Sequence, residues 1–76
     1  MQDKKLFFNG IEAVKSFCDI CNEQAFDVDL YSGKYIVNGK SIMGIFSLDL
    51  THPVIMKTGA GCTAEFYSKI ECFVVQ

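Results

Sequence analysis

Apolar and polar residues alternate from Phe26 to Val37 around a Ser32-Gly33 pair. Such alternation is typical of strands that bury one face of a sheet, and glycine readily adopts the positive φ of a tight hairpin turn. With a two-residue loop at Ser32-Gly33, we expect Leu30 to face Tyr35 across the hairpin. The chain must then contain a sheet with one buried and one open face. The apolar face comprises Phe26, Val28, Leu30, Tyr35 and Val37, and the polar face comprises Asp27, Asp29, Tyr31 and Lys34.

Helical and strand patterns on both sides of this hairpin complete the fold. After an Asn9-Gly10 turn, apolar residues at helical spacing predict a helix from Ile11 to about Glu23. The order β-α-β-β-α-β-α predicts a single α+β domain over residues 1–76, a four-stranded sheet with helices on one face. The apolar stripe of the first helix comprises Ile11, Val14, Phe17, Cys18, Cys21 and Ala25. The other expected elements are a strand at 4–8, a helix at 42–48 capped by Ser41, a strand at 54–57 and a helix at 63–74.

The composition limits the classes of function. The chain has 76 residues with a net charge of −2, and its seven basic residues are all lysine. A nucleic-acid-binding surface needs a basic face, so no direct nucleic-acid contact is expected. The sequence contains no nucleophile–base pair, phosphate loop or metal quartet, so we expect neither an enzyme nor a bound metal or cofactor. Its apolar runs are too short for a signal-peptide core or a membrane span, which predicts a cytoplasmic protein without membrane contact.

Four cysteines are present, and two of them form a C-x-x-C motif, Cys18-Asp19-Ile20-Cys21. Because this pair lies in the apolar stripe of the first helix, we expect it to pack in the core as small hydrophobic residues. Metal binding and disulfide cycling are the alternatives, since residues three apart lie on one helix face. Cys62 follows Gly61 in a loop and is expected to be the most exposed of the four.

From Asn38 to Leu48 the chain reads NGKSIMGIFSL. This run closely resembles a motif of HPr, the phosphocarrier of the bacterial sugar phosphotransferase system. The resemblance extends to nearly the whole chain and is strongest from residue 27 to residue 50. It implies an open-faced β-sandwich of four antiparallel strands covered on one face by three helices. That fold agrees with the element order predicted above.

The resemblance also identifies where the chain departs from the family. HPr proteins carry the phosphoacceptor histidine at the start of the first helix, and ungapped counting from Asp27 places Gly10 at that position. Glu12 then stands at the position of the family's arginine, and its carboxylate would repel a phosphoryl group. The only histidine, His52, lies in the Leu50–Pro53 connection and is interpreted as an exposed loop residue. In having the serine without the histidine, the chain is similar to the Crh class.

Ser41 is the first residue to which the resemblance gives a role. Serine is among the best helix N-caps, and in some HPr proteins the equivalent serine is phosphorylated from ATP by HPr kinase. The phosphorylated protein then acts as a corepressor in carbon catabolite control. A phosphate at a helix N-cap faces unpaired N–H groups, and Lys40 would add a nearby cation. Capping and regulatory phosphorylation at Ser41 are compatible with each other.

The short helix after Ser41 is apolar on nearly all sides. Such a helix cannot bury all its apolar residues in a two-layer domain, so part of it should form an exposed patch for a partner. Ile42, Met43 and Phe46, with Lys40 beside them, match the surface with which HPr proteins dock onto their partners. The implied partners are proteins of the phosphotransferase system or a catabolite-control regulator. A purely structural role of these apolar residues is the alternative.

These observations favour a regulatory or adaptor protein of the phosphotransferase system without histidine phosphotransfer, switched by phosphorylation at Ser41. One alternative is a working phosphocarrier in sugar transport, for which only His52 is available as the acceptor. The other is a degenerate domain that retains the fold alone, with neither a partner nor phosphorylation.

Overall fold

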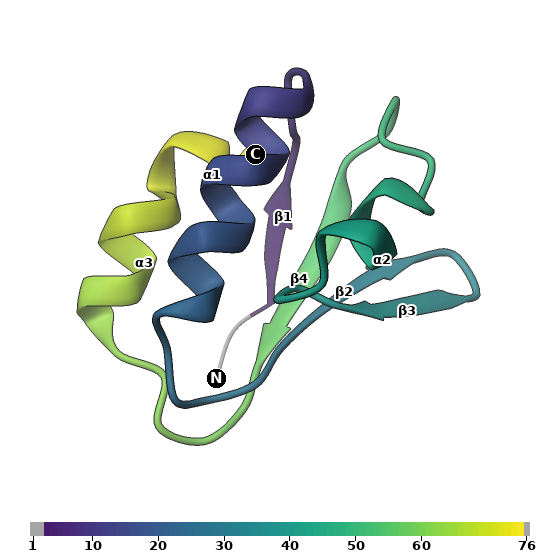
Figure 1. Ribbon diagram of the computed structural model, residues 1–76. Helices are drawn as coiled ribbons and strands as arrows, with labels where there is room; N and C mark the ends of the chain where they lie inside the picture. The colour runs from purple at the N-terminus through teal and green to yellow at the C-terminus, as the bar shows by residue number, and fades with distance from the viewer. Residues whose placement is uncertain (1–2, 76) are drawn as a thin grey trace.

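The structure is a computed structural model that describes residues 3–75 of the chain. Its element order confirms the predicted β-α-β-β-α-β-α arrangement (Figure 1). The elements are β1 (Lys4–Leu6), α1 (Ile11–Asn22), β2 (Val28–Ser32), β3 (Tyr35–Asn38), α2 (Ile42–Phe46), β4 (Val54–Thr58), α3 (Ala64–Ile70) and a 3-10 turn, η1 (Glu71–Phe73).

The four strands form one antiparallel sheet in the order β1-β4-β2-β3. The outer edge of β1 is covered by the last described residues of the chain. The Phe7 amide donates to the Phe73 carbonyl at 2.9 Å, and the Val75 amide donates to the Lys5 carbonyl at 2.8 Å. The C-terminal segment therefore protects one edge of the sheet from pairing with another chain.

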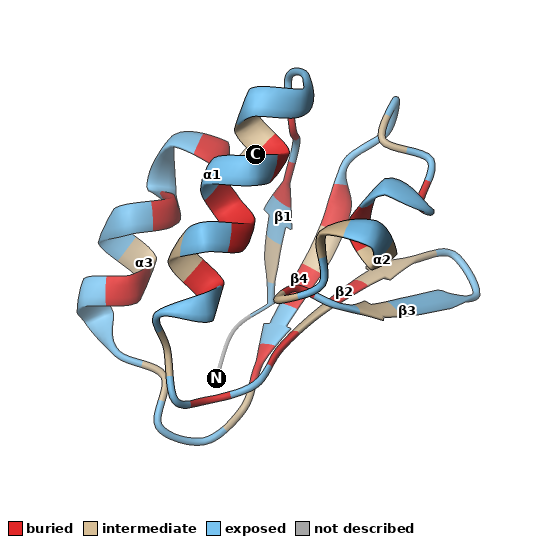
Figure 2. Ribbon diagram, in the orientation of Figure 1, coloured by how far each residue is buried: buried red, intermediate tan, exposed pale blue. Residues whose placement is uncertain are grey.

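The helices cover one face of the sheet and leave the other face open (Figure 1). Both α1 and α3 carry buried residues (Figure 2), and these belong to one core cluster with buried residues of the strands. Near the start of α1, the rings of Phe8 and Phe17 lie 5.0 Å apart, and Phe73 lies 5.7 Å and 5.8 Å from them. The largest fully buried side chains are Leu6, Val14, Phe17, Cys21, Val28, Leu30, Ile45, Val54, Met56, Phe66 and Ile70.

The β2–β3 hairpin turns one residue later than predicted. Gly33 and Lys34 form the loop, Ser32 pairs with Tyr35, and Leu30 pairs with Val37 rather than with Tyr35. The φ of Gly33 is +60°, so the glycine occupies the first loop position and not the second. A register shift of two residues leaves each side chain on its predicted face. It also moves Tyr35 to the end of the hairpin, where its side chain is 71% exposed instead of buried.

The predicted helices are correct in place and too long at their ends. α1 ends at Asn22, α2 at Phe46 and α3 at Ile70, each one to four residues before the expected end. Ile11 and Ala25 were expected in the buried stripe of the first helix, and both are exposed. The prediction failed because Ile11 is the first residue of α1 and Ala25 lies beyond its end. Among the described residues, no helix has the length and apolar character needed to cross a membrane.

Candidate functional site

Ser41 lies at the N-terminus of α2, on the exposed surface. Its backbone is extended, with φ −105° and ψ 108°, and its hydroxyl oxygen accepts a hydrogen bond from the Gly44 amide at 3.2 Å. This geometry confirms the predicted N-cap, which satisfies one of the unpaired N–H groups at the start of a helix. A Cβ on Gly44 would lie 3.3 Å from the Ser41 hydroxyl oxygen, so a side chain at residue 44 would crowd the cap.

The side chain of Lys40 contacts the segment that follows α1. The Nζ atom donates to the carbonyl of Gln24 at 2.9 Å, just beyond the C-terminal end of α1. A cation is favourable there because the carbonyl end of a helix carries a partial negative charge. The expectation that Lys40 adds a cation near Ser41 stays a prediction, and in this structure its ammonium is bound to the Gln24 carbonyl.

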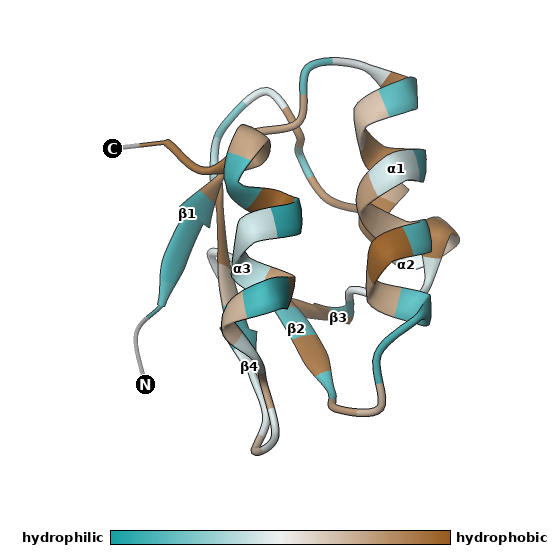
Figure 3. Cartoon of the chain, turned by 90° about the vertical axis from the view of Figure 1, so that its left-hand side faces the viewer, coloured by the Kyte–Doolittle hydropathy of each residue, from teal (hydrophilic) through white to brown (hydrophobic). Residues whose placement is uncertain are grey.

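The apolar residues of α2 divide between the core and the surface. Ile45 is fully buried and Ile42 is half-buried against the core, whereas Met43 is 77% exposed and Phe46 is 41% exposed. This apolar stretch of α2 stands out in the hydropathy view (Figure 3). Ile11, at the start of α1, is 64% exposed. We call Ile11, Ile42, Met43 and Phe46 the docking patch.

A groove of about 330 Å³ separates the start of α1 from the end of α2. Gly10, Ile11 and Phe46 line it together with Thr51 from the α2–β4 connection. Sequence reasoning did not identify Ile11 and Thr51 as part of this surface. The only available signal was the resemblance, which placed the family's active-site position at Gly10, next to Ile11.

The N-terminus of α1 begins after a glycine in an unusual backbone conformation. Gly10 precedes the helix with φ +103° and ψ 174°, and no side chain caps the helix there. Nothing lies within 4 Å of a Cβ built on Gly10, so space for a side chain is present. The backbone conformation nevertheless favours glycine strongly. Glu12 is an acidic residue in the first turn of α1.

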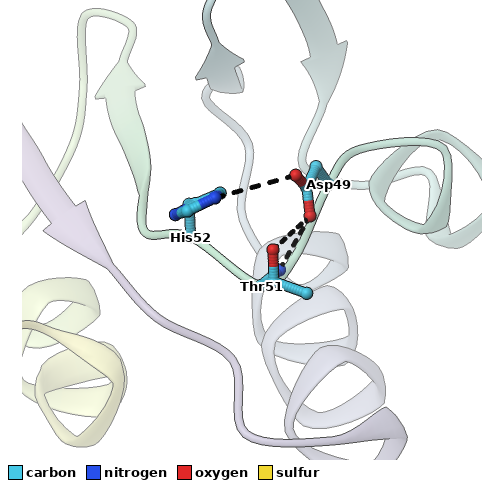
Figure 4. A network of polar contacts seen from close by, with 3 residues as sticks. All are labelled: Asp49, Thr51 and His52. Carbon is cyan, nitrogen blue, oxygen red and sulfur yellow. Dashed lines mark hydrogen bonds and ion pairs between the residues drawn. The ribbon is translucent and has the colours of Figure 1, made fainter.

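The α2–β4 connection holds a small polar network (Figure 4). The hydroxyl and the amide of Thr51 donate to the same oxygen of Asp49 at 2.6 Å and 3.1 Å. The Nε2 atom of His52 lies 4.0 Å from the other carboxylate oxygen, and the imidazole is exposed, as predicted. The hydrogen bonds from Thr51 are the main reason that the pKa of Asp49 lies below its usual range. The nearby His52 lowers the pKa further. Because Thr51 lines the groove with Gly10, this connection lies beside the start of α1.

The cysteines fit the predicted core role at the C-x-x-C motif. Cys18 and Cys21 are buried, and burial raises the pKa of both thiols, that of Cys21 to about 12. At neutral pH such groups are protonated, and a protonated thiol is neither a metal ligand nor a nucleophile. Within residues 3–75 no three histidine, cysteine or acidic side chains gather as a metal site. The prediction for Cys62 is wrong: it is partly buried, and Cys72, in η1, is the exposed cysteine.

Comparisons with known proteins identify the fold. No family model matches the sequence, and no curated protein matches it significantly. The crystal structure of HPr-C-His from Thermoanaerobacter tengcongensis is similar, with a TM-score of 0.76 and 19% identity over 95% of this chain and 89% of that one. The phosphocarrier protein HPr from Bacillus anthracis str. Ames gives a TM-score of 0.74 and 20% identity over 97% and 96% of the two chains. The chain therefore has the HPr-like open-faced β-sandwich fold.

Proposed function

We propose that this chain is an HPr-like adaptor of the bacterial sugar phosphotransferase system, one that binds partner proteins without carrying a phosphoryl group on a histidine. One observation carries the proposal. Gly10 stands at the start of α1, where the family resemblance places the acceptor imidazole, while Ile11, Met43 and Phe46 of the docking patch are exposed. Exposed apolar side chains on neighbouring helices are typical of a protein-binding surface. A protein that has a partner-binding surface but lacks the acceptor histidine can act as an adaptor, and we place this adaptor in the cytoplasm.

Ser41 is the residue that we propose as the switch of this adaptor. It is exposed at the N-terminus of α2, two residues before Met43 of the docking patch. A phosphate there would carry a charge of about −1.5 to −2 at pH 7. That charge would favour partners with basic residues and oppose purely apolar ones. The proposed partners are an HPr kinase and either a protein of the phosphotransferase system or a catabolite-control regulator.

The test of this proposal is the intact mass of the protein after incubation with ATP and an HPr kinase that is active on a genuine HPr. We expect the mass of one phosphate to be added to the unmodified chain and not to Ser41→Ala. Ser47→Ala is the matched control, because Ser47 is an exposed serine at the opposite end of α2. No added phosphate under conditions in which HPr is modified would contradict the switch. It would leave an unregulated adaptor or a degenerate domain.

A working phosphocarrier with His52 as the acceptor is the second candidate function. Two observations favour it: the Asp49 carboxylate lies beside the His52 imidazole, and Thr51 shares the groove with the start of α1. Phosphoenolpyruvate-dependent labelling by enzyme I of the phosphotransferase system distinguishes the two candidates. Labelling that disappears in His52→Ala would establish the phosphocarrier and contradict the adaptor. An unlabelled chain would agree with the adaptor.

A further inference from the structure

The C-terminal half of α1 holds the backbone that leads into α2. The side-chain amide of Asn22 donates to the carbonyl of Lys40 at 3.0 Å and to the carbonyl of Cys18 at 2.9 Å. The Cys18 thiol donates to the same Lys40 carbonyl at 3.4 Å. We call these three residues the α1–α2 clamp. Both oxygens that face the Asn22 amide are acceptors, so its NH₂ group and not its oxygen must face them.

The clamp fixes the residue directly before Ser41. The Lys40 amide also donates to the side chain of Asn38 at 2.8 Å, and the Lys40 ammonium binds the Gln24 carbonyl. Lys40 is therefore restrained at its amide, its carbonyl and its side chain. Because the Lys40 carbonyl belongs to the peptide unit that continues into Ser41, holding this oxygen fixes the plane of the peptide unit from which the Ser41 backbone starts.

We infer that Asn22 is a positioning residue for Ser41, acting through the carbonyl of Lys40. This inference rests on the proposed function, since it concerns the same serine. Asn22 lies on α1, and within residues 3–75 its side-chain amide donates to Cys18 and Lys40 and to no residue of the docking patch. Its effect is to hold the N-terminus of α2 in the geometry in which Ser41 caps Gly44. The same restraint presents the Ser41 hydroxyl to a kinase in one orientation.

Gln24 provides a matched control for Asn22. Its side-chain amide donates to the carbonyl of Ile20 at 3.0 Å, four residues earlier, just as Asn22 donates to Cys18. Gln24→Ala therefore removes a bond of the same kind from the same end of α1 without releasing Lys40, whose ammonium binds the Gln24 backbone. Asn22→Asp is an isosteric variant in which the charged carboxylate has no proton to donate.

The first measurement is hydrogen exchange of the Gly44 amide, which donates to the Ser41 hydroxyl oxygen. In Asn22→Ala and Asn22→Asp we expect this exchange to become roughly fivefold faster, the effect of losing one hydrogen bond of ordinary strength. In Gln24→Ala it should change less than about twofold, because the clamp is intact. An unchanged Gly44 amide in both Asn22 variants, or an equal change in Gln24→Ala, would overturn the inference.

The second measurement is the kinetics of Ser41 phosphorylation by the HPr kinase. Misplacing the acceptor hydroxyl should lower kcat roughly fivefold in the Asn22 variants and leave KM unchanged, since the docking patch is intact. A rise in KM with constant kcat would contradict positioning. If the unmodified chain is not phosphorylated at all, the proposed switch fails. The exchange of the Gly44 amide then decides by itself whether Asn22 positions Ser41.

Discussion

The ammonium of Lys40 lies 2.9 Å from the carbonyl oxygen of Gln24, and this contact joins the start of α2 to the end of α1 across 16 residues of sequence. The last turn of α1 contains no basic residue of its own. Lys40 therefore supplies from a distant segment the positive charge that favours a helix C-terminus.

Replacing Lys40 with methionine should reduce the stability of the domain. The methionine keeps most of the aliphatic stem and loses the ammonium, at an expected cost of about 1 kcal/mol in the free energy of unfolding. Urea denaturation measures this cost. Lys34→Met is the control, because Lys34 is exposed in the β2–β3 turn. Equal losses in the two variants would show that the Gln24 contact adds no stability.

Gly10→Ala should destabilise the domain although the position has room for a side chain. The loss of stability comes from backbone strain, because residues with a Cβ avoid the conformation of Gly10, with φ +103° and ψ 174°. We expect a loss of about 1–3 kcal/mol in thermal or urea unfolding. Gly59→Ala is the comparison, since a Cβ there meets ordinary contacts from 3.5 Å and Gly59 has no positive φ. A neutral Gly10→Ala would mean that the start of α1 relaxes without strain.

The strands and helices could be predicted because their signals are local. The alternation from Phe26 to Val37 and the helical spacing from Val14 to Cys21 both report which side chains face the core. The register of the β2–β3 hairpin does not follow from the alternation alone. A Gly in a two-residue loop fits more than one position, and the choice at Gly33 depends on the turn type that the flanking strands accept.

The candidate site was predictable only in part. Ser41 as a cap and the exposure of Met43 follow from a serine before a short, wholly apolar helix. Ile11, Phe46 and Thr51 line one groove because of how α1 packs beside the α2–β4 connection. No local sequence pattern predicts that packing. The hydrogen bond from Lys40 to the Gln24 carbonyl is equally non-local, because a long, flexible side chain can reach carbonyls of several segments and only the fold decides which of them is near.

Met43→Ser should weaken partner binding without unfolding the protein. Met43 is 77% exposed, so its truncation removes little from the core, while the loss of a contact that is a binding hot spot weakens an interface by about tenfold or more. We expect KM for the HPr kinase to rise by about that factor. Ile36→Ser, 59% exposed on β3 and outside the docking patch, is the control. Equal effects of Met43→Ser and Ile36→Ser on KM would show that the docking patch has no special role in partner recognition.

Asp49 gives a prediction for pH dependence. The hydrogen bonds from Thr51 lower the pKa of Asp49 in the folded state, so its stabilising contribution is complete above the unfolded pKa and is lost as the pH falls through the folded pKa. Thr51→Val removes the hydroxyl donor and should raise the pKa of Asp49 toward its ordinary value. NMR titration of the carboxyl carbon measures the change. Thr51→Ser, which keeps the hydroxyl, should preserve the lowered pKa, and a shift of equal size in both variants would assign it to another cause.

The thiols should differ sharply in their reaction with iodoacetamide at pH 7. Cys72 is exposed, whereas Cys18 and Cys21 are buried and their pKa values are raised, so very little thiolate is available at either. We expect Cys72 to be alkylated first, and Cys18 and Cys21 to react only when urea unfolds the domain. Mass spectrometry of proteolytic fragments follows each site, and Cys72→Ser should abolish the fast phase while leaving the slow sites unchanged. Rapid alkylation of Cys18 in the folded protein would show that the α1–α2 clamp opens, because its thiol is bound to the Lys40 carbonyl when the clamp is closed.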